Sequence, residues 1–222
     1  PPANPELLDW LARDFAEHGF RLKHAVKRIM TSRTYQLAAE ARDTSTMGDE
    51  LHHSHALVLP LEAEQLLDAM AKVTGSTIKF EGYPKGLRAN QIPAPPQSPR
   101  RGGSMGMGER FLKVFGKPDR LLTCECERND DPGLLQAFQM ITGDVMNKML
   151  ADPGNRISKF MSAGKSDAEM LEEFYLASLC RYPTDAEKAK LLVYLSKGID
   201  RRAAWEDVLW GLLNAKEFLL RR

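Results

Sequence analysis

Two short groups of metal-ligating residue types stand out in the sequence. Cys124 and Cys126 are one residue apart, so in an extended segment their sulfurs lie on the same side. His52 and His55 would share one face of a helix. Thiolates and imidazoles are ligands that suit zinc and copper. These four residues are a candidate zinc or copper site, although no pattern brings them together. Buried or paired cysteines and surface histidines are the plainer interpretation, and the default expectation is a chain without a cofactor.

Acid–base and nucleophilic chemistry has weaker support. Glu125 and Glu127 would share a face of an extended strand, but carboxylates beside Arg128 are more typical of a surface ion-pair network. The sequence contains no Gly-x-Ser-x-Gly, His-Glu-x-x-His or Walker motif. A glycine-rich run at 102–108 follows no strand and lacks a Gly-Lys-Ser/Thr ending, which favours flexibility over phosphate binding. Whether the chain is an enzyme stays open, with a metal-assisted hydrolase or redox enzyme using the His/Cys site as the alternative.

Basic residues are concentrated in two segments. Residues 21–42 carry six Lys/Arg and one acid, and residues 97–120 carry six against two. Such patches suit an anionic partner, for example a sulfated polysaccharide or an acidic protein surface, unless acids elsewhere in the fold neutralise them. The candidate ligand-binding residues are Lys23, Lys27, Arg28, Arg100 and Arg101. Because 31 basic and 30 acidic residues nearly balance, we expect no specific nucleic-acid binding.

The elements that must position these residues are helices. Asn4-Pro5 is a typical helix start, and apolar residues then recur at helical spacing until Gly19. A second helix from about residue 22 to 32 places Lys23 and Lys27 opposite its apolar face, and the short turn predicts an antiparallel pair. A third helix is expected from about 61 to 74, with Gly75 at its end.

Further helices follow a segment rich in Pro and Gly. Between Gly82 and Gly108 these residues exclude a long helix or central strand. Two capping boxes, Ser166 with Glu169 and Thr184 with Glu187, predict helices over 167–181 and 185–197. The other expected helices are 109–115, a helix from Asp131-Pro132 to 150 with Gly143 as a break, and 200–220.

The prediction is therefore an all-α, multi-helical fold. Its expected parts are an N-terminal helical lobe (1–81), a Pro/Gly-rich crossing segment (82–108) and a C-terminal bundle (109–222), with at most one short extended segment near 120–128. No run approaches the roughly 18 apolar residues of a transmembrane helix, so we expect no membrane span.

Several short segments resemble a known family when taken in order. Near the cysteines, Lys117-Pro118-Asp119-Arg120 precedes Cys124-Glu125-Cys126-Glu127-Arg128 and Asp130-Asp131-Pro132. The chain resembles the C-terminal domain of unknown function (DUF1553, PSD type) of large planctomycete proteins that also carry a cytochrome c-like domain. The other segments that carry the resemblance are Asn4-Pro5-Glu6-Leu7-Leu8, Glu17-His18-Gly19-Phe20, Met30-Thr31-Ser32-Arg33-Thr34-Tyr35-Gln36, Pro60-Leu61-Glu62-Ala63-Glu64, Val73-Thr74-Gly75, Phe111-Leu112-Lys113-Val114-Phe115-Gly116, Tyr175-Leu176-Ala177, Arg181-Tyr182-Pro183-Thr184 and Leu213-Asn214-Ala215-Lys216-Glu217-Phe218.

The resemblance implies a cellular location and neighbouring domains, but no reaction. Proteins of this kind are typically exported, which implies an extracytoplasmic location, and their haem lies in a separate domain with a Cys-x-x-Cys-His motif that this sequence lacks. Export would allow a disulfide between Cys124 and Cys126, or from either to Cys180, which we otherwise expect in the core. The leading hypothesis is a non-catalytic module that contacts upstream domains of its parent protein or an anionic polysaccharide.

Overall fold

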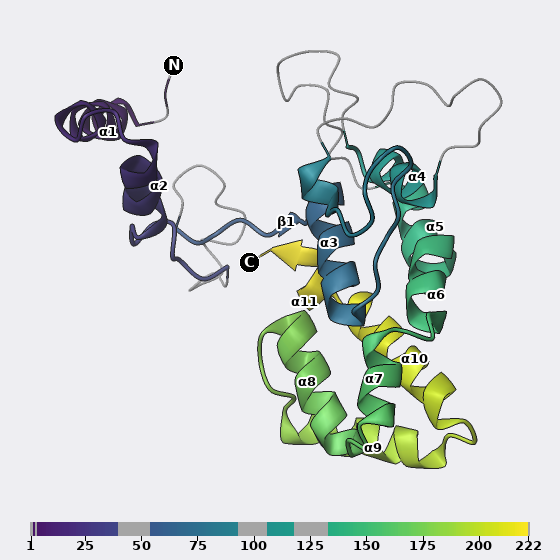
Figure 1. Cartoon of the computed structure of the whole chain (residues 1–222). Coiled ribbons are helices and arrows are strands. Elements are labelled where there is room, and N and C mark those ends of the chain that lie inside the picture. The colour runs from purple at the N-terminus through teal and green to yellow at the C-terminus, as the bar shows by residue number, and fades with distance from the viewer. Residues whose placement is uncertain (1, 3, 40–53, 93–105, 118–132, 222) are drawn as a thin grey trace. The chain divides into compact units, whose positions relative to one another are not determined.

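A computed structural model of the chain describes residues 2, 4–39, 54–92, 106–117 and 133–221. The chain divides into two units, and Figure 1 shows the elements of each. We call Pro1–Leu59 with Arg221–Arg222 the N-terminal unit and Pro60–Leu220 the main unit. The predicted lobe boundary at residue 81 differs from this division at residue 59, because the apolar face of the third helix packs into the core of the main unit.

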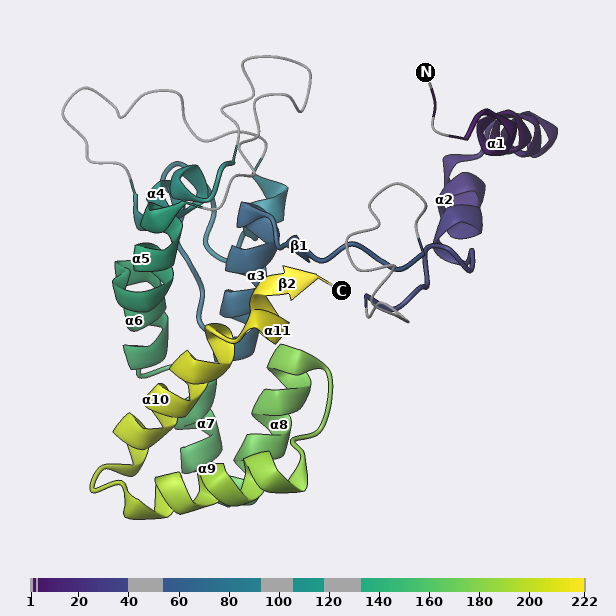
Figure 2. The ribbon, with the colours of Figure 1, turned by 180° about the vertical axis from the view of Figure 1, so that it is seen from behind.

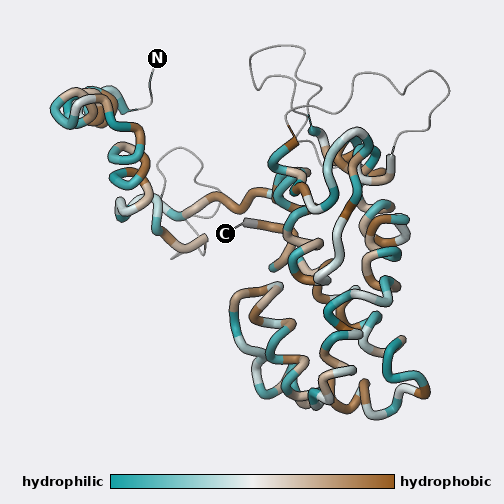
Figure 3. Tube along the Cα trace, viewed as in Figure 1, coloured by the Kyte–Doolittle hydropathy of each residue, from teal (hydrophilic) through white to brown (hydrophobic). Residues whose placement is uncertain are grey.

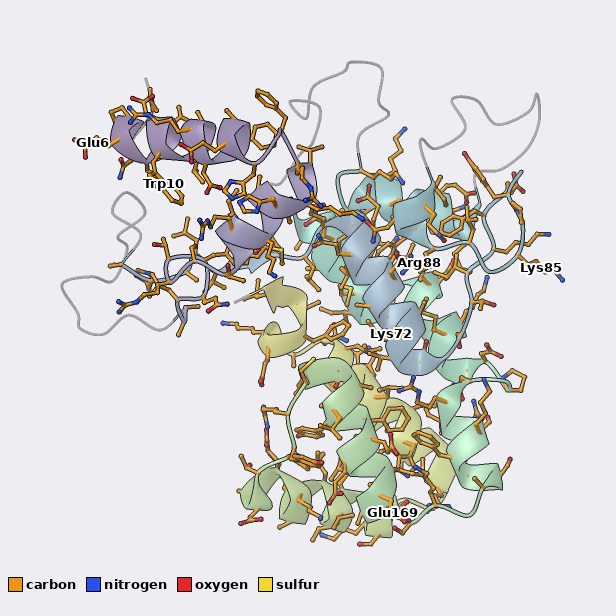
Figure 4. The ribbon with its side chains drawn as sticks, turned by 60° about the vertical axis from the view of Figure 1, so that its left-hand side comes forward. Glu6, Trp10, Lys72, Lys85, Arg88 and Glu169 are labelled. Atoms are coloured by element: carbon orange, nitrogen blue, oxygen red, sulfur yellow. The ribbon has the colours of Figure 1, made fainter. Side chains whose placement is uncertain are left out.

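The N-terminal unit contains helices α1 (Pro5–Glu17) and α2 (Leu22–Met30). The predicted start is confirmed, since Asn4 Oδ1 accepts a hydrogen bond from the Leu7 amide at 3.0 Å. The chain turns through Gly19 and Phe20, which both have positive φ. The helix axes cross steeply in Figures 1 and 4, so the predicted antiparallel arrangement is wrong. Two successive left-handed residues redirect the chain, which spacing alone does not reveal.

The N-terminal unit is built around a polar centre. Among its described residues, Asp14 alone is buried. The apolar side of α2, by contrast, is exposed, with Val26 at 52% and Leu22 at 73% of their full accessibility. Figure 3 shows hydrophobic and hydrophilic residues alternating along this helix. In the described part of the chain, the α1–α2 pair therefore has no buried apolar core of its own.

The main unit holds the hydrophobic core. Its helices are α3 (Ala63–Thr74), the short 3₁₀ helix η1 (Ala89–Gln91), α4 (Met107–Val114), α5 (Leu134–Thr142), α6 (Asp144–Ala151), α7 (Arg156–Ser162), α8 (Asp167–Leu179), α9 (Asp185–Lys197), α10 (Arg201–Leu213) and α11 (Lys216–Leu219). Helix α9 lies along one end of this unit and contacts α8 and α10 (Figures 1 and 2). The all-α prediction is confirmed; β1 (Leu59–Pro60) and β2 (Leu220–Arg221) form a two-residue strand pair.

Large buried side chains from α3, α8 and α10 meet at the centre of the core. Trp205 is fully buried, and its ring centroid lies 5.5 Å from that of Phe174. Helix α3 ends at Gly75, as expected; φ there is +70°, and a Cβ would lie 3.3 Å from Arg156, so glycine suits both the turn and the contact. Cys180 was expected in the core but is exposed, because α8 ends there in a left-handed residue.

Predicted helix boundaries hold where local caps specify them. Both capping boxes are present, and α9 spans the expected residues 185–197. The helix expected up to residue 150 is divided at Gly143 into α5 and α6, and the last one is divided near Ala215 into α10 and α11. The expected extended segment at 120–128 lies outside the described residues. Within the described residues, every helix is too short or too polar to cross the hydrocarbon core of a bilayer.

Candidate functional site

The strongest cluster of chemically active side chains lies between α1 and α2. Asp14 on α1 accepts a hydrogen bond from Arg28 Nη2 at 3.1 Å, and its Oδ2 lies 3.0 Å from His24 Nε2. His18, just after α1, places Nδ1 2.7 Å from the Asp14 carbonyl oxygen and 3.6 Å from Oδ1. The imidazole rings of His18 and His24 stack, with centroids 3.8 Å apart. One carboxylate is thus shared by two imidazoles and a guanidinium.

Opposing effects set the charge state of this carboxylate. Burial alone would raise the pKa of Asp14, but hydrogen bonds from Arg28 and His24 and their positive charge outweigh it, so the pKa lies below its ordinary value. The Arg28 guanidinium also lies over the Trp10 ring, 5.4 Å from its centroid. Trp10 is labelled on α1 in Figure 4. An ionised carboxylate therefore lies at the centre of the N-terminal unit.

Replacing Asp14 with Asn should loosen the α1–α2 pair, because the amide keeps the shape but removes the charge that Arg28 and His24 share. We expect faster amide hydrogen exchange in α1 and α2 and unchanged exchange in the main unit. The lowered pKa means that wild-type protection is present above pH 3.8 and is lost as pH falls through the pKa of the folded state. Asp9→Asn, on the exposed side of α1, is the control; equal acceleration in both variants would contradict this role.

A second feature of the N-terminal unit is a shallow groove along α2. Lys23 and Lys27, which were expected opposite the apolar face, instead line the groove together with Leu22, Val26 and Met30. Both lysines are exposed, whereas Arg28 is engaged by Asp14. Anion binding by these residues stays a prediction. The groove therefore combines an apolar floor with two positive charges.

The other predicted site residues are only partly described. His55 is half-buried, with Nδ1 3.1 Å from the Ser54 hydroxyl. The predicted residues that lie outside the described part are His52, Arg100, Arg101, Cys124, Glu125, Cys126, Glu127 and Arg128. The His/Cys metal site and anion binding by Arg100 and Arg101 thus stay predictions.

In the main unit, Arg181 joins three helices. Its guanidinium donates hydrogen bonds of 2.8–2.9 Å to both carboxylate oxygens of Glu187 and of Glu217. The hydrogen bonds from Arg181 are the main reason that the pKa of Glu187 falls to about 2. Arg181 also lies over the Tyr175 ring, and burial is the main reason that the pKa of Tyr175 is raised.

A cleft of about 610 Å³ lies beside this network. Its walls come from α8, α9, α10 and α11, and Leu179, Leu191 and Leu212 contribute to its apolar lining. At one side the Tyr194 hydroxyl donates to Asp207 at 2.7 Å. Since Arg181 already pairs with two carboxylates, the cleft suits an apolar group better than acid–base chemistry.

The main unit also buries charged side chains near α4. Lys117 Nζ lies 3.6 Å from Glu64 Oε1 and donates to the Ile92 carbonyl at 3.0 Å. Glu109 is 3% exposed, and its Oε1 accepts from the Glu81 amide at 2.7 Å. Buried charges with several partners hold neighbouring backbone segments in place.

Comparison with known protein families assigns most of the chain to one family. A family model described as PSD1, protein of unknown function (DUF1553), matches residues 1–195. The chain belongs to this family. The DUF1553 match includes the whole α1–α2 pair and extends into α9. No curated protein and no solved structure matches the chain. The family assignment made from short segments is therefore confirmed, and it carries no known activity.

Sequence reasoning missed the Asp14 cluster. Asp14 and His18 have the i,i+4 spacing that signals neighbours on a helix, but His24 lies beyond the turn. Their proximity depends on how α2 crosses α1. The signal in the sequence was His18, four residues after Asp14. It lies in Glu17-His18-Gly19-Phe20, a segment that was used only for the family resemblance.

Proposed function

We propose that this DUF1553 chain is a non-catalytic helical module that contacts another domain of an exported multidomain protein, through α2. The observation that carries the proposal is the apolar face of α2, which is exposed and bordered by Lys23 and Lys27. An exposed apolar patch with a charged rim is typical of protein interaction sites. The resemblance to cytochrome c-associated proteins supports a haem-carrying neighbour and an extracytoplasmic location.

The composition of the groove favours a protein partner over a polysaccharide. Leu22, Val26 and Met30 form an apolar floor, which a helix with an apolar, acidic face would cover. Burying this surface would supply roughly 25 cal/mol per Å² before the costs of association. A sulfated polysaccharide would use the two lysines but leave the apolar floor exposed. The lysines should therefore set the rate and salt dependence of association, and the apolar residues should set its lifetime.

The test is titration of the chain with the purified cytochrome c-like domain of its parent protein. Val26→Asp should weaken binding by roughly tenfold or more, because a charge would enter the apolar contact. Val193→Asp on α9 is a matched control, since Val26 and Val193 are both 52% exposed. Lys23→Glu with Lys27→Glu should slow association and reduce its salt dependence.

Two results would overturn this proposal. One is a lack of measurable binding to the cytochrome c-like domain. The other is salt-sensitive binding to a sulfated polysaccharide such as heparin that Val26→Asp leaves unchanged, which would make the lysines an anion site instead.

A further inference from the structure

The centre of the α1–α2 pair has the composition of a metal site. Among the described residues of the N-terminal unit, the buried position is occupied by Asp14 instead of an apolar side chain. Small units without an apolar core commonly depend on a metal ion or a disulfide for stability. Donor atoms of Asp14, His18 and His24 all lie within 4.8 Å of one another. Among the described residues, this is the group of three donor side chains close enough together to hold a metal ion.

We propose that Asp14, His18 and His24 bind a zinc ion that joins α1 to α2. Two imidazoles and one carboxylate form a ligand set typical of zinc sites that keep a fourth position for water. Ligand atoms around a tetrahedral zinc ion, about 2.0–2.1 Å from the metal, lie roughly 3.3 Å apart. Asp14 Oδ2 lies 3.0 Å from His24 Nε2 and Asp14 Oδ1 lies 3.6 Å from His18 Nδ1, so each imidazole nitrogen is near this spacing from one of the two carboxylate oxygens.

Binding requires a small local rearrangement. The two imidazole rings are nearly parallel, with an interplanar angle of 12°. A metal ion lies in the plane of each imidazole that it binds, so one ring must turn about its Cβ–Cγ bond to face the shared ion. His18 is the ring that turns, because its side chain is 44% exposed and that of His24 is 29% exposed. Turning breaks the hydrogen bond that His18 Nδ1 donates to the Asp14 carbonyl oxygen at 2.7 Å, and Nδ1 gives up this proton when it binds the ion.

Arg28 competes with the ion for the carboxylate. Its guanidinium donates to Asp14 Oδ1 at 3.1 Å, at the position that zinc would approach. Zinc binding would displace this positive charge, and the Trp10 ring, already 5.4 Å from the guanidinium, would keep Arg28 nearby. Loss of Arg28 should therefore have two separate effects: weaker pairing of α1 with α2 in the absence of zinc, and tighter binding of zinc.

The test is calorimetric titration of the full chain, purified without a histidine tag, with zinc chloride. We expect one zinc ion per chain. His24→Ala and His18→Ala should each weaken zinc binding roughly tenfold or more through the loss of a ligand. Arg28→Gln should tighten zinc binding by roughly threefold or more, because a competing cation is removed. A gain of affinity cannot result from a variant that fails to fold.

His55→Ala is the matched control for histidine loss. This residue lies in the N-terminal unit but belongs to the other candidate site, with His52, Cys124 and Cys126. Its substitution should leave zinc affinity unchanged. No zinc binding by the full chain would overturn the proposal, and so would loss of binding in His55→Ala with retention in His24→Ala. Weaker zinc binding in Arg28→Gln would also contradict it. None of these results depends on whether α2 binds a protein domain.

Discussion

Replacing Lys117 with Met should lower the free energy of unfolding of the main unit by about 3–5 kcal/mol. The Lys117 and Glu64 side chains are only 1% and 6% exposed, and their charged atoms are 3.6 Å apart. The same ammonium donates to the carbonyl oxygens of Ile92 and Ala89. Methionine fills the space but leaves a buried carboxylate and two carbonyl groups without this partner, which makes the loss large.

Urea denaturation followed by tryptophan fluorescence would measure this loss, because Trp205 reports on the core. Lys113→Met is a matched control, since Lys113 is exposed on α4 and should change stability by less than about 0.5 kcal/mol. The double variant Lys117→Met, Glu64→Gln should recover part of the loss, because it no longer buries that carboxylate charge. A loss below about 1 kcal/mol in Lys117→Met would show that the pair does not stabilise the fold.

The second large effect is expected from Arg181→Gln. Glutamine cannot reproduce the paired hydrogen bonds to Glu187 and Glu217, which connect the end of α8 to the start of α9 and to α11. Charge-assisted bonds of this kind contribute about 1.5–3 kcal/mol, and the side chains are about one-third exposed. Because solvent screening reduces that contribution, we expect a loss of about 2 kcal/mol at pH 7.

This loss should depend on pH in a defined direction. The pKa of Glu187 falls from 4.5 to about 2 in the folded protein, so its stabilising contribution is present above pH 4.5 and is lost as pH falls toward 2. Without Arg181, the pKa of Glu187 returns toward its ordinary value. The stability difference between wild type and Arg181→Gln should therefore be smaller at pH 3 than at pH 7.

Denaturation at both pH values tests this expectation. Lys188→Gln removes a single ion pair between α9 and Glu172 on α8 and is the control, with an expected loss below about 1 kcal/mol at pH 7. An equal difference at pH 7 and pH 3 in the Arg181 variant would contradict the role assigned to Glu187.

Much of the helical architecture could be predicted because its signals are local. Asn4 and the two capping boxes each bond to a residue three positions along the chain, so a short stretch of sequence is enough to recognise them. The starts of α1, α8 and α9 follow directly from them. Breaks were harder to predict: Ala215 carries no strong helix-ending signal, yet the chain changes direction there to form α11.

The sequence by itself determined the all-α class, the family and the residue types available for chemistry. Only the tertiary structure decided which of these residues meet. Asp14 and His24 are ten residues apart and Glu64 and Lys117 are fifty-three, and each pair is brought together by the crossing of helices or by core packing. Neither process leaves a periodic signal, because a crossing angle depends on the turn and on the shapes of both surfaces. The exposed apolar face of α2 has the same origin, since periodicity predicts an apolar face but not what covers it.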